Sequence, residues 1–422
     1  MQTYPARAVV DLDAIAANVR TLGASTPAEV MAVVKADGYG HGLVPSACAA
    51  RRGGATWLGA AQVTEALVLR AAGDTGRILT WLYTPGAPLR EAVEADVDVA
   101  IAAPWNVAAL ADAARAAGRT ARVQIKVDTG LGRNGVTPDQ LPDVLDAALR
   151  AQAEGVLDVV GVFSHFAFAD APRHPTVLAQ AEEFARAVEL VERAGARLEV
   201  RHLANSAATV TNADVHYDLV RPGIAVYGLS PVPDLSSSAE LGLVPAMTFE
   251  SELASVKLLP AGHGVSYAHQ YVTPAETLVG LVPIGYADGV PRHVSGTGGV
   301  PGAPVRVGAR NLAIAGRVCM DQFVIDLGPG AHEVEGERVE LFGTGADGGP
   351  TAQDWADVAG TISYEIVTRV GARVPRTYTG TDAATSPSLS AEIGNSDRDR
   401  QSGGPTSAGT ADLTATAGRA EA

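Results

Sequence analysis

Cysteine is scarce in this sequence, since Cys48 and Cys319 are the only two among 422 residues. Two cysteines cannot build a disulfide framework, and such a composition is typical of a reducing compartment. No apolar stretch is long enough to cross a bilayer, and the opening MQTYPARAVVDLDAI lacks the apolar core of a signal peptide. These absences predict a cytoplasmic protein with no membrane partner.

Positive charge is also in short supply. Lysine and arginine total 32 against 47 aspartates and glutamates, which gives a formal net charge of −15. This balance argues against nucleic acid or an anionic membrane as a partner. The nine histidines form no H-E-x-x-H motif and no cluster with cysteine, so no bound metal is predicted.

Apolar residues make up 47 % of the chain and fall into a regular pattern. After a helix that Asp11 can cap, strand-like runs alternate with helical runs. The predicted strands cover residues 30–34, 56–59, 77–83, 97–102, 122–128, 159–165, 198–204 and 219–227. Strand–helix alternation implies parallel pairing, and eight such units imply a closed (β/α)8 TIM-like barrel, so the fold class is α/β. An open doubly wound sheet is the alternative, although no G-x-G-x-x-G follows any predicted strand.

A second domain is expected after the barrel, which is predicted to span residues 1–235. Residues 236–380 contain strand-like runs separated by glycine and proline, among them 247–259 and 267–272. Closing helices are expected near 351–358 and 364–371, so the segment predicts a mainly-β domain. The strand at 6–10 precedes the barrel and is expected to pack with this second domain. Residues 381–422 are poor in apolar side chains and are expected to be disordered.

Lys35 stands at the end of the first predicted barrel strand, within AVVKADGYGHG. The glycines that follow allow a tight turn and close approach of the backbone to a bulky group. A lysine in this position has two interpretations. It can lay its stem on apolar surface with the ammonium group in water, or it can be a Schiff-base lysine whose pKa is lowered by desolvation.

Other polar side chains follow the remaining predicted strands. They are Tyr83, Lys126 with Asp128, His165, Asn205 and Arg221. In a barrel the carboxyl ends of the strands meet at one face, where the chemistry of barrel enzymes takes place. These residues are therefore predicted to form a polar ring around Lys35, which favours the Schiff-base interpretation.

Longer motifs extend over both predicted domains. They are KVDTGLGRNG at 126–135, FSHFA at 163–167, RHLANSAA at 201–208, LVRPGIAVYG at 219–228, GHGVSYAHQY at 262–271, AGRVCMDQ at 315–322 and ISYEI at 362–366. Together with AVVKADGYGHG, they resemble the motifs of alanine racemases over residues 8–378. Leu131 replaces the family's usual methionine, a conservative apolar change. The resemblance implies a barrel followed by a β domain, pyridoxal 5′-phosphate as cofactor, alanine as substrate and a homodimer.

The resemblance implies two catalytic residues, Lys35 and Tyr267. Lys35 would bind the cofactor covalently. Racemisation requires that a proton leave Cα on one face and return on the other, which two opposed groups achieve directly. Tyr267 would be the second group, with His165 and Arg221 as the hydrogen-bonded network behind it. Family members supply this tyrosine from the second domain of the other protomer, so shared active sites are expected.

The resemblance also places Arg221 against the pyridine nitrogen of the cofactor. A guanidinium group cannot accept a proton, so the ring would stay neutral, which favours return of the proton to Cα over transamination. The other cofactor-binding residues implied are Tyr39, His165, Asn205, Ser206, Gly223, Ile224 and Tyr364. The substrate-binding residues implied are Arg133 and Met320.

Three supporting residues complete the set implied by the resemblance: Lys126, Asp321 and Tyr286. Family members often carry a carboxylated lysine at the position of Lys126, where it steadies the arginine that matches Arg133. Tyr286 would narrow the entrance and exclude side chains much larger than a methyl group.

The sequence favours alanine racemase activity, which supplies D-alanine for peptidoglycan. A racemase of broader or serine specificity is one alternative. A non-catalytic pyridoxal-phosphate-binding barrel is another, but such proteins lack the β domain that carries Tyr267. A barrel decarboxylase is disfavoured because Arg221 stands where those enzymes have a glutamate.

Overall fold

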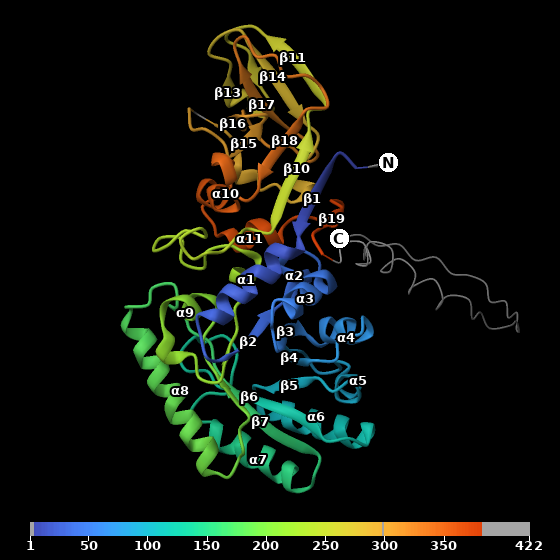
Figure 1. Cartoon of the computed structure of the whole chain (residues 1–422), viewed down its shortest axis with the longest axis vertical. Helices are drawn as coiled ribbons and strands as arrows, with labels where there is room; N and C mark the ends of the chain where they lie inside the picture. Colours follow the sequence, from blue (N-terminus) through green and yellow to red (C-terminus); the bar gives the residue numbers. More distant parts are fainter. Residues whose placement is uncertain (1–3, 298, 382–422) are drawn as a thin grey trace, which may run out of the picture. The chain divides into compact units, whose positions relative to one another are not determined.

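The computed structural model describes residues 4–297 and 299–381, and its first domain is a barrel (Figure 1). Eight strands form one parallel sheet in the order β8-β7-β6-β5-β4-β3-β2-β9. An isolated parallel bridge between Asn205 and Arg221, just beyond β8 and β9, joins the two ends of the sheet. The near-closed (β/α)8 barrel predicted from the alternation is therefore confirmed, and the open-sheet alternative is wrong.

The barrel elements follow the apolar runs of the sequence closely. The strands are β2 (Glu29–Val33), β3 (Trp57–Gln62), β4 (Arg77–Leu82), β5 (Asp98–Ile101), β6 (Ala121–Lys126), β7 (Leu157–Phe163), β8 (Val200–His202) and β9 (Leu219–Val220). The helices are α1 (Leu12–Ala24), α2 (Lys35–Tyr39), α3 (Leu43–Arg52), α4 (Val63–Ala71), α5 (Leu89–Glu94), α6 (Pro104–Ala117), α7 (Leu141–Ala153), α8 (Pro175–Arg193) and α9 (Ser206–Thr211). Asp11 caps α1 as expected, because its carboxylate accepts from the N–H groups of Asp13 and Ala14.

Side chains fill the barrel interior, as in other barrels of this size. A separate buried cluster takes one residue from each barrel strand other than β6: Met31, Trp57, Leu79, Ala100, Phe163, Val200 and Leu219. In the register of the sheet, β6 places the fully buried Gln124 beside Ala100 and Gly161. One polar side chain therefore enters an otherwise apolar layer.

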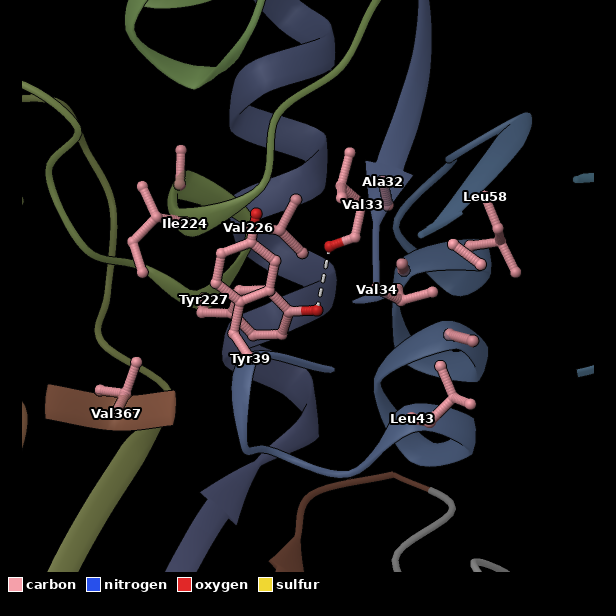
Figure 2. Close-up of a cluster of buried hydrophobic side chains, with 14 of the residues drawn as sticks. Ala32, Val33, Val34, Tyr39, Leu43, Leu58, Ile224, Val226, Tyr227 and Val367 are labelled. Carbon is pink, nitrogen blue, oxygen red and sulfur yellow. Dashed lines mark hydrogen bonds between the residues drawn. The ribbon is translucent and has the colours of Figure 1, made fainter. Parts of the chain in front are cut away.

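The predicted strand at 219–227 is wrong beyond its first two residues. β9 ends at Val220, and the buried run Ile224–Tyr227 forms a 3-10 turn, η2, after Pro222 and Gly223. A short apolar run has no periodicity that separates a buried strand from a buried turn. Figure 2 shows Ile224, Val226 and Tyr227 packed beside β2, where the Tyr227 hydroxyl donates to the carbonyl of Val33 at 3.2 Å.

The second domain is mainly β, as predicted. Its six-stranded sheet has the order β16-β15-β18-β10-β1-β19, and a three-stranded sheet has the order β11-β14-β17. The strands are β1 (Ala6–Asp11), β10 (Met247–Glu252), β11 (Ser255–Leu259), β12 (Gly264–Val265), β13 (Tyr271–Val272), β14 (Thr277–Val282), β15 (Pro304–Val307), β16 (Arg310–Ala313), β17 (Phe323–Gly328), β18 (Arg338–Phe342) and β19 (Arg376–Thr379). Two helices, α10 (Ala352–Ala359) and α11 (Ser363–Thr368), lie between β18 and β19.

The first strand of the chain belongs to the sheet of the second domain. β1 pairs antiparallel with β10 and parallel with β19, so the first and last strands of the described chain are neighbours in the sheet (Figure 1). The chain then passes from β1 directly into α1 of the barrel. The barrel segment of the chain is thus preceded by β1 and followed by β10, both of which are strands of the second domain's sheet.

Two predicted β runs in the second domain differ from the structure. The run 247–259 is divided into β10 and β11, which belong to different sheets. The run 267–272 begins with a 3-10 turn, η3 (Tyr267–His269), in which Ala268 and His269 have positive φ angles that a strand does not contain.

Apart from Thr381, the segment 381–422 that was expected to be disordered lies outside the described residues. Among residues 4–297 and 299–381, no helix has the length and apolarity needed to cross a membrane. Over the same residues, no three histidine, cysteine, aspartate or glutamate side chains gather where a metal ion could be held.

The aromatic core of the second domain allows a stability test. Phe249 is 1 % exposed and lies edge-on to Phe342, which in turn contacts Trp355. Phe249→Ala should lower the free energy of unfolding by about 3–5 kcal/mol, because it removes buried area and leaves a cavity. Urea denaturation followed by circular dichroism measures this. Leu258→Ala, in a side chain 61 % exposed, should change stability by less than about 0.5 kcal/mol; equal losses in both variants would contradict this packing.

Candidate active site

A cavity of about 580 Å³ opens at the carboxyl ends of the barrel strands. The predicted site residues that line it are Lys35, Tyr39, Lys126, Arg133, His165, Asn205, Ser206, Arg221, Gly223 and Tyr364. They come from five different strand ends and from α11, far apart in sequence. The barrel therefore brings together the greater part of the predicted ring.

Two members of the predicted polar ring, Tyr83 and Asp128, do not line the cavity. Tyr83 donates its hydroxyl to the carbonyl of Ala100 and packs edge-on to Trp105, so it supports the barrel wall. Asp128 shapes the loop that carries Arg133, because its carboxylate accepts from the N–H groups of Gly130 and Gly132.

The turn after β2 holds Lys35 at the cavity. Ala36, Asp37, Gly38 and Tyr39 have φ angles of 55°, 54°, 60° and 54°, which is one turn of left-handed helix. Non-glycine residues adopt this conformation at a cost of about 1–3 kcal/mol each, so the surrounding contacts must hold it in place. The carboxylate of Glu65 accepts from Ala36 N at 2.7 Å, and that of Asp37 accepts from Leu43 N at 2.8 Å.

The pKa of Lys35 is lowered from its ordinary value. Desolvation is the main cause, and the positive charge of Arg133 adds to it, while the Glu65 carboxylate opposes it. The ammonium group lies 6.0 Å from the ring centre of Trp81. A lysine with a lowered pKa has more free amine at neutral pH, the form that acts as a nucleophile and a base.

Lys126 is the second lysine of the cavity. Burial, followed by the charges of Arg221, Arg133 and Lys35, lowers its pKa to about 7. Lowering the pKa in this way increases the share of Lys126 that is a neutral amine at physiological pH. Its amine lies 5.6 Å from the ring centre of Phe163, one of the residues lining the cavity.

Arg221 is buried at the base of the cavity without a carboxylate contact among the described residues. Its Nη2 donates to the carbonyl oxygens of Ser164 at 2.6 Å and Leu203 at 3.2 Å, and its Nη1 lies 3.1 Å from His202 Nδ1. Desolvation lowers the pKa of Arg221 to about 9. His165, 3.4 Å from Nη2, has a pKa well below its ordinary value because it is buried among cations.

Gly223 and Ser206 form one wall of the cavity. The Ser206 hydroxyl oxygen accepts from Gly223 N at 2.7 Å, and a side chain at Gly223 would collide with the Tyr39 hydroxyl. Tyr39 itself stacks on Tyr227 at 4.9 Å, as Figure 2 shows. Ile224 follows Gly223 with its side chain fully buried among these residues, so only its backbone can face the cavity.

Apart from Tyr364, the second-domain residues predicted for the site do not line this cavity. Tyr267, Met320 and Tyr286 are 68 %, 54 % and 41 % exposed, and Asp321 pairs with Arg373 at 2.9 Å. Backbone and hydroxyl hydrogen bonds hold these residues near one another. Ser266 Oγ donates to Arg317 O, Tyr286 N to Cys319 O, and Ala287 N to Met320 O.

Sequence reasoning missed several residues that line or support the cavity. They are Val33, Ala36, Glu65, Trp81, Phe163, Ile362, Glu365, Thr368 and Arg369. Phe163 lies inside the motif FSHFA, and Ile362 and Glu365 lie inside ISYEI. These motifs could therefore have identified the three residues as part of the site. The role of Glu65 depends on a hydrogen bond across 29 residues, which leaves no local signal.

The fold and the site define a two-domain barrel enzyme with a buried lysine among cations. Residues 10–231 match the family described as alanine racemase, N-terminal domain, and residues 246–378 match alanine racemase, C-terminal domain. An alanine racemase of Beutenbergia cavernae is 60 % identical over 379 residues, covering 90 % of this chain and 99 % of that protein. The alanine racemase of Streptomyces coelicolor is 56 % identical over 88 % of this chain and 95 % of that protein.

The structural comparison agrees. The crystal structure of alanine racemase from D-cycloserine-producing Streptomyces lavendulae matches with a TM-score of 0.88 and 53 % identity, over 90 % of this chain and 98 % of that one. The chain therefore belongs to the alanine racemase family, and it is an enzyme of the isomerase class.

The cationic cavity can be tested by titrating its lysines. Arg133→Met should raise the pKa of both Lys35 and Lys126, because the charge of Arg133 lowers both. Glu65→Gln should lower the pKa of Lys35 further, because its carboxylate favours the ammonium form. Carbon-13 NMR of labelled lysine in the cofactor-free protein measures each pKa directly.

The chain is suited to this measurement because Lys257 is its one other lysine, and Lys257→Arg assigns its signal. Arg150→Met is the control, since the Arg150 side chain is 72 % exposed on the outer helix α7. Unchanged lysine pKa values in Arg133→Met would contradict the electrostatic description of the cavity.

Proposed function

We propose that this chain interconverts L-alanine and D-alanine with pyridoxal 5′-phosphate, using Lys35 and Tyr267 as two opposed acid–base groups. The observation that carries the proposal is the cavity itself, in which a lysine of lowered pKa lies among Lys126, Arg133 and Arg221. When bound, the cofactor withdraws electrons from the attached amino acid and makes its Cα proton acidic.

The cavity residues fit this cofactor. A phosphate group is a multivalent anion, and the cavity presents several cations with few carboxylates. The absence of a side chain at Gly223 lets the Tyr39 hydroxyl lie against it, and the Ser206 hydroxyl accepts from Gly223 N, so two hydroxyl groups lie together in this wall. Tyr364 and Asn205 line the same cavity. Ile224 does not line it, but it follows Gly223 directly, and its backbone N–H would complete the set. These residues would bind the phosphate and hold the cofactor beside Lys35.

Each cationic residue would have a separate task. Lys35 attaches the cofactor and moves a proton on its face of Cα. Arg221 would face the pyridine nitrogen of the cofactor, and because a guanidinium group cannot accept a proton, this nitrogen would stay unprotonated. A neutral ring favours return of the substrate proton to Cα over transamination. Arg133 would bind the substrate carboxylate, with Lys126 beside it. The neutral amine of Lys126, favoured by a pKa of about 7, is the form that reacts with carbon dioxide to give the carboxylated side chain.

Tyr267 would enter the active site of a second copy of the chain. Tyr267 is 68 % exposed, and Met320 and Tyr286 are exposed as well. None of the three lines the cavity of its own chain. The η3 turn that presents Tyr267 is strained, since Ser266, Ala268 and His269 have positive φ angles. Such strain is typical of functional loops. A homodimer with shared sites, in which Tyr267 and Met320 face the partner's Lys35, accounts for this arrangement.

The biological role follows from the reaction. D-Alanine is a building block of peptidoglycan, and a racemase in the cytoplasm would supply it. Tyr286 and Met320 would narrow the entrance to the site, and Asp321 would be held behind them by Arg373. A narrow entrance favours alanine over larger amino acids. Racemisation rates measured over alanine, serine and larger amino acids test this specificity, and equal rates would contradict it.

Removal of the lysine tests cofactor attachment. Lys35→Ala should lose the covalently bound cofactor and its visible absorbance, and activity should fall by about 10²–10⁴-fold, the range for a general acid–base group. Borohydride should fix the cofactor to the wild-type chain at Lys35 and to no other peptide, as mass spectrometry of the digest would report. Lys257→Arg is the control and should retain colour and activity. Fixation at Lys126 instead would contradict the assignment of Lys35.

Hybrid dimers test the sharing of active sites. Lys35→Ala and Tyr267→Ala chains should each be nearly inactive, and Tyr267→Ala should still bind the cofactor. Mixing equal amounts with exchange of subunits should restore about one quarter of wild-type activity, because half of the dimers are mixed and each mixed dimer keeps one intact site. The racemase assay and native mass spectrometry measure activity and exchange. Complete exchange without recovered activity would count against shared sites.

A further inference from the structure

A line of buried polar side chains crosses the interior of the barrel behind the cavity. Arg221 Nη1 lies 3.1 Å from His202 Nδ1, and His202 Nε2 lies 2.7 Å from Gln124 Oε1. Gln124 Nε2 then donates to Asp98 Oδ2 at 2.9 Å. The line thus runs from the β9 end through β8 and β6 to β5, within the core of the barrel.

The barrel makes room for this line at a specific place. Gln124 and His202 are fully buried, and Asp98 is 1 % exposed. A Cβ at Gly161, the neighbour of Gln124 in β7, would lie 3.1 Å from the Gln124 side-chain carbonyl carbon. Phe163 stacks in parallel on the His202 ring at 4.8 Å. A buried amide is costly unless both of its ends are bonded, and here both ends are bonded.

The charge of Asp98 sets the direction of every hydrogen bond in the line. Arg122 donates to Asp98 Oδ1 at 3.0 Å, and Arg77 lies 3.7 Å from the same oxygen. Burial raises the pKa of Asp98, and the guanidinium of Arg122 acts in the opposite direction. Because Arg122 and Arg77 both face its Oδ1, Asp98 is paired with cations and accepts from Gln124 through Oδ2. Only the NH₂ end of Gln124 can donate to it. The carbonyl end of Gln124 therefore faces His202.

The orientation of Gln124 in turn determines the tautomer of His202. Because Gln124 Oε1 can only accept, His202 Nε2 must carry the hydrogen. Burial and the facing charge of Arg221 lower the pKa of His202 well below its ordinary value, so the ring is neutral and Nδ1 has a free lone pair. Among the described residues, this Nδ1 is the acceptor that Arg221 Nη1 meets.

We propose that Asp98 and Gln124 are positioning residues that fix the Nε2–H tautomer of His202 and thereby orient the Arg221 guanidinium at the cavity. The opposite tautomer would place two N–H groups against each other at 3.1 Å and displace Arg221. Gln124 and His202 also separate the Asp98 carboxylate from Arg221, so this carboxylate forms no ion pair with the guanidinium. The consequence for turnover rests on the proposed racemase function, whereas the tautomer does not.

Nitrogen-15 NMR of histidine-labelled full-length protein tests the tautomer, with and without pyridoxal phosphate. The His202 signal, assigned by its loss in His202→Phe, should show a neutral ring protonated at Nε2. A ring protonated at Nδ1 in the wild type would overturn the proposal. This measurement requires neither substrate nor cofactor, so it remains decisive even if the proposed function fails.

Two nearly isosteric variants test the role of the line. In Asp98→Asn the neutral amide lets Gln124 turn over, and the Nδ1–H tautomer of His202 should appear. In Gln124→Glu the NH₂ group that donates to Asp98 is replaced by an oxygen, so the hydrogen bond to Asp98 is lost. The new carboxylate also faces Nε2 and should raise the pKa of His202. In both variants kcat for alanine should fall by about 10- to 100-fold, the range typical of groups that orient a functional residue through a hydrogen bond, with a smaller change in KM.

Thr80→Val is the matched control. Thr80 is a fully buried barrel residue on β4 that donates to the carbonyl of Ala61, outside the line. This variant should lose stability without changing the His202 signal or kcat. His202 signals or kcat values that stay at the wild-type level in Asp98→Asn and Gln124→Glu would overturn the proposal. If one of these variants does not fold, the other decides the outcome.

Discussion

The burial of positive charge at the carboxyl end of the barrel is the constraint on which this structure depends. Lys35, Lys126 and Arg221 lie in one cavity, and desolvation is the first cause of the lowered pKa of each. Removing cations from water without nearby carboxylates is costly, and the rest of the fold must compensate. The result is a cavity that favours anions and holds free amine at neutral pH, the two properties that a covalent phosphate-bearing cofactor requires.

The fold compensates for this cost with rigid contacts from distant parts of the chain. Backbone carbonyls of Ser164 and Leu203 accept from Arg221 in place of a carboxylate. Glu65, from α4, bonds the strained turn after Lys35. The sheet of the second domain incorporates β1, so the strand that leads into the barrel is fixed by β10 and β19. The strained turn after Lys35 and the Arg221 guanidinium thus occur where the surrounding contacts hold the backbone in a single conformation.

The two domains serve different parts of the chemistry that we propose. The barrel provides the cavity, with its charge and its buried hydrogen-bond line. The second domain presents Tyr267, Tyr286 and Met320 on an exposed surface, held together through the backbone of Cys319 and Met320. Under this proposal the two groups needed at one carbon atom would meet only in an assembly, which would link catalysis to the association of two copies.

The sequence by itself determined the barrel, the mainly-β domain and the identity of the polar residues at the strand ends. These features depend on short-range patterns: apolar runs of strand length, caps such as Asp11, and motifs within ten residues. Tertiary structure alone decided the left-handed turn after Lys35, the conversion of Ile224–Tyr227 into a turn, and the removal of Tyr83 from the cavity. It also decided the line from Asp98 to Arg221, because each hydrogen bond in it joins strands far apart in sequence. Local periodicity contains no information about such contacts, which exist only once the barrel has closed.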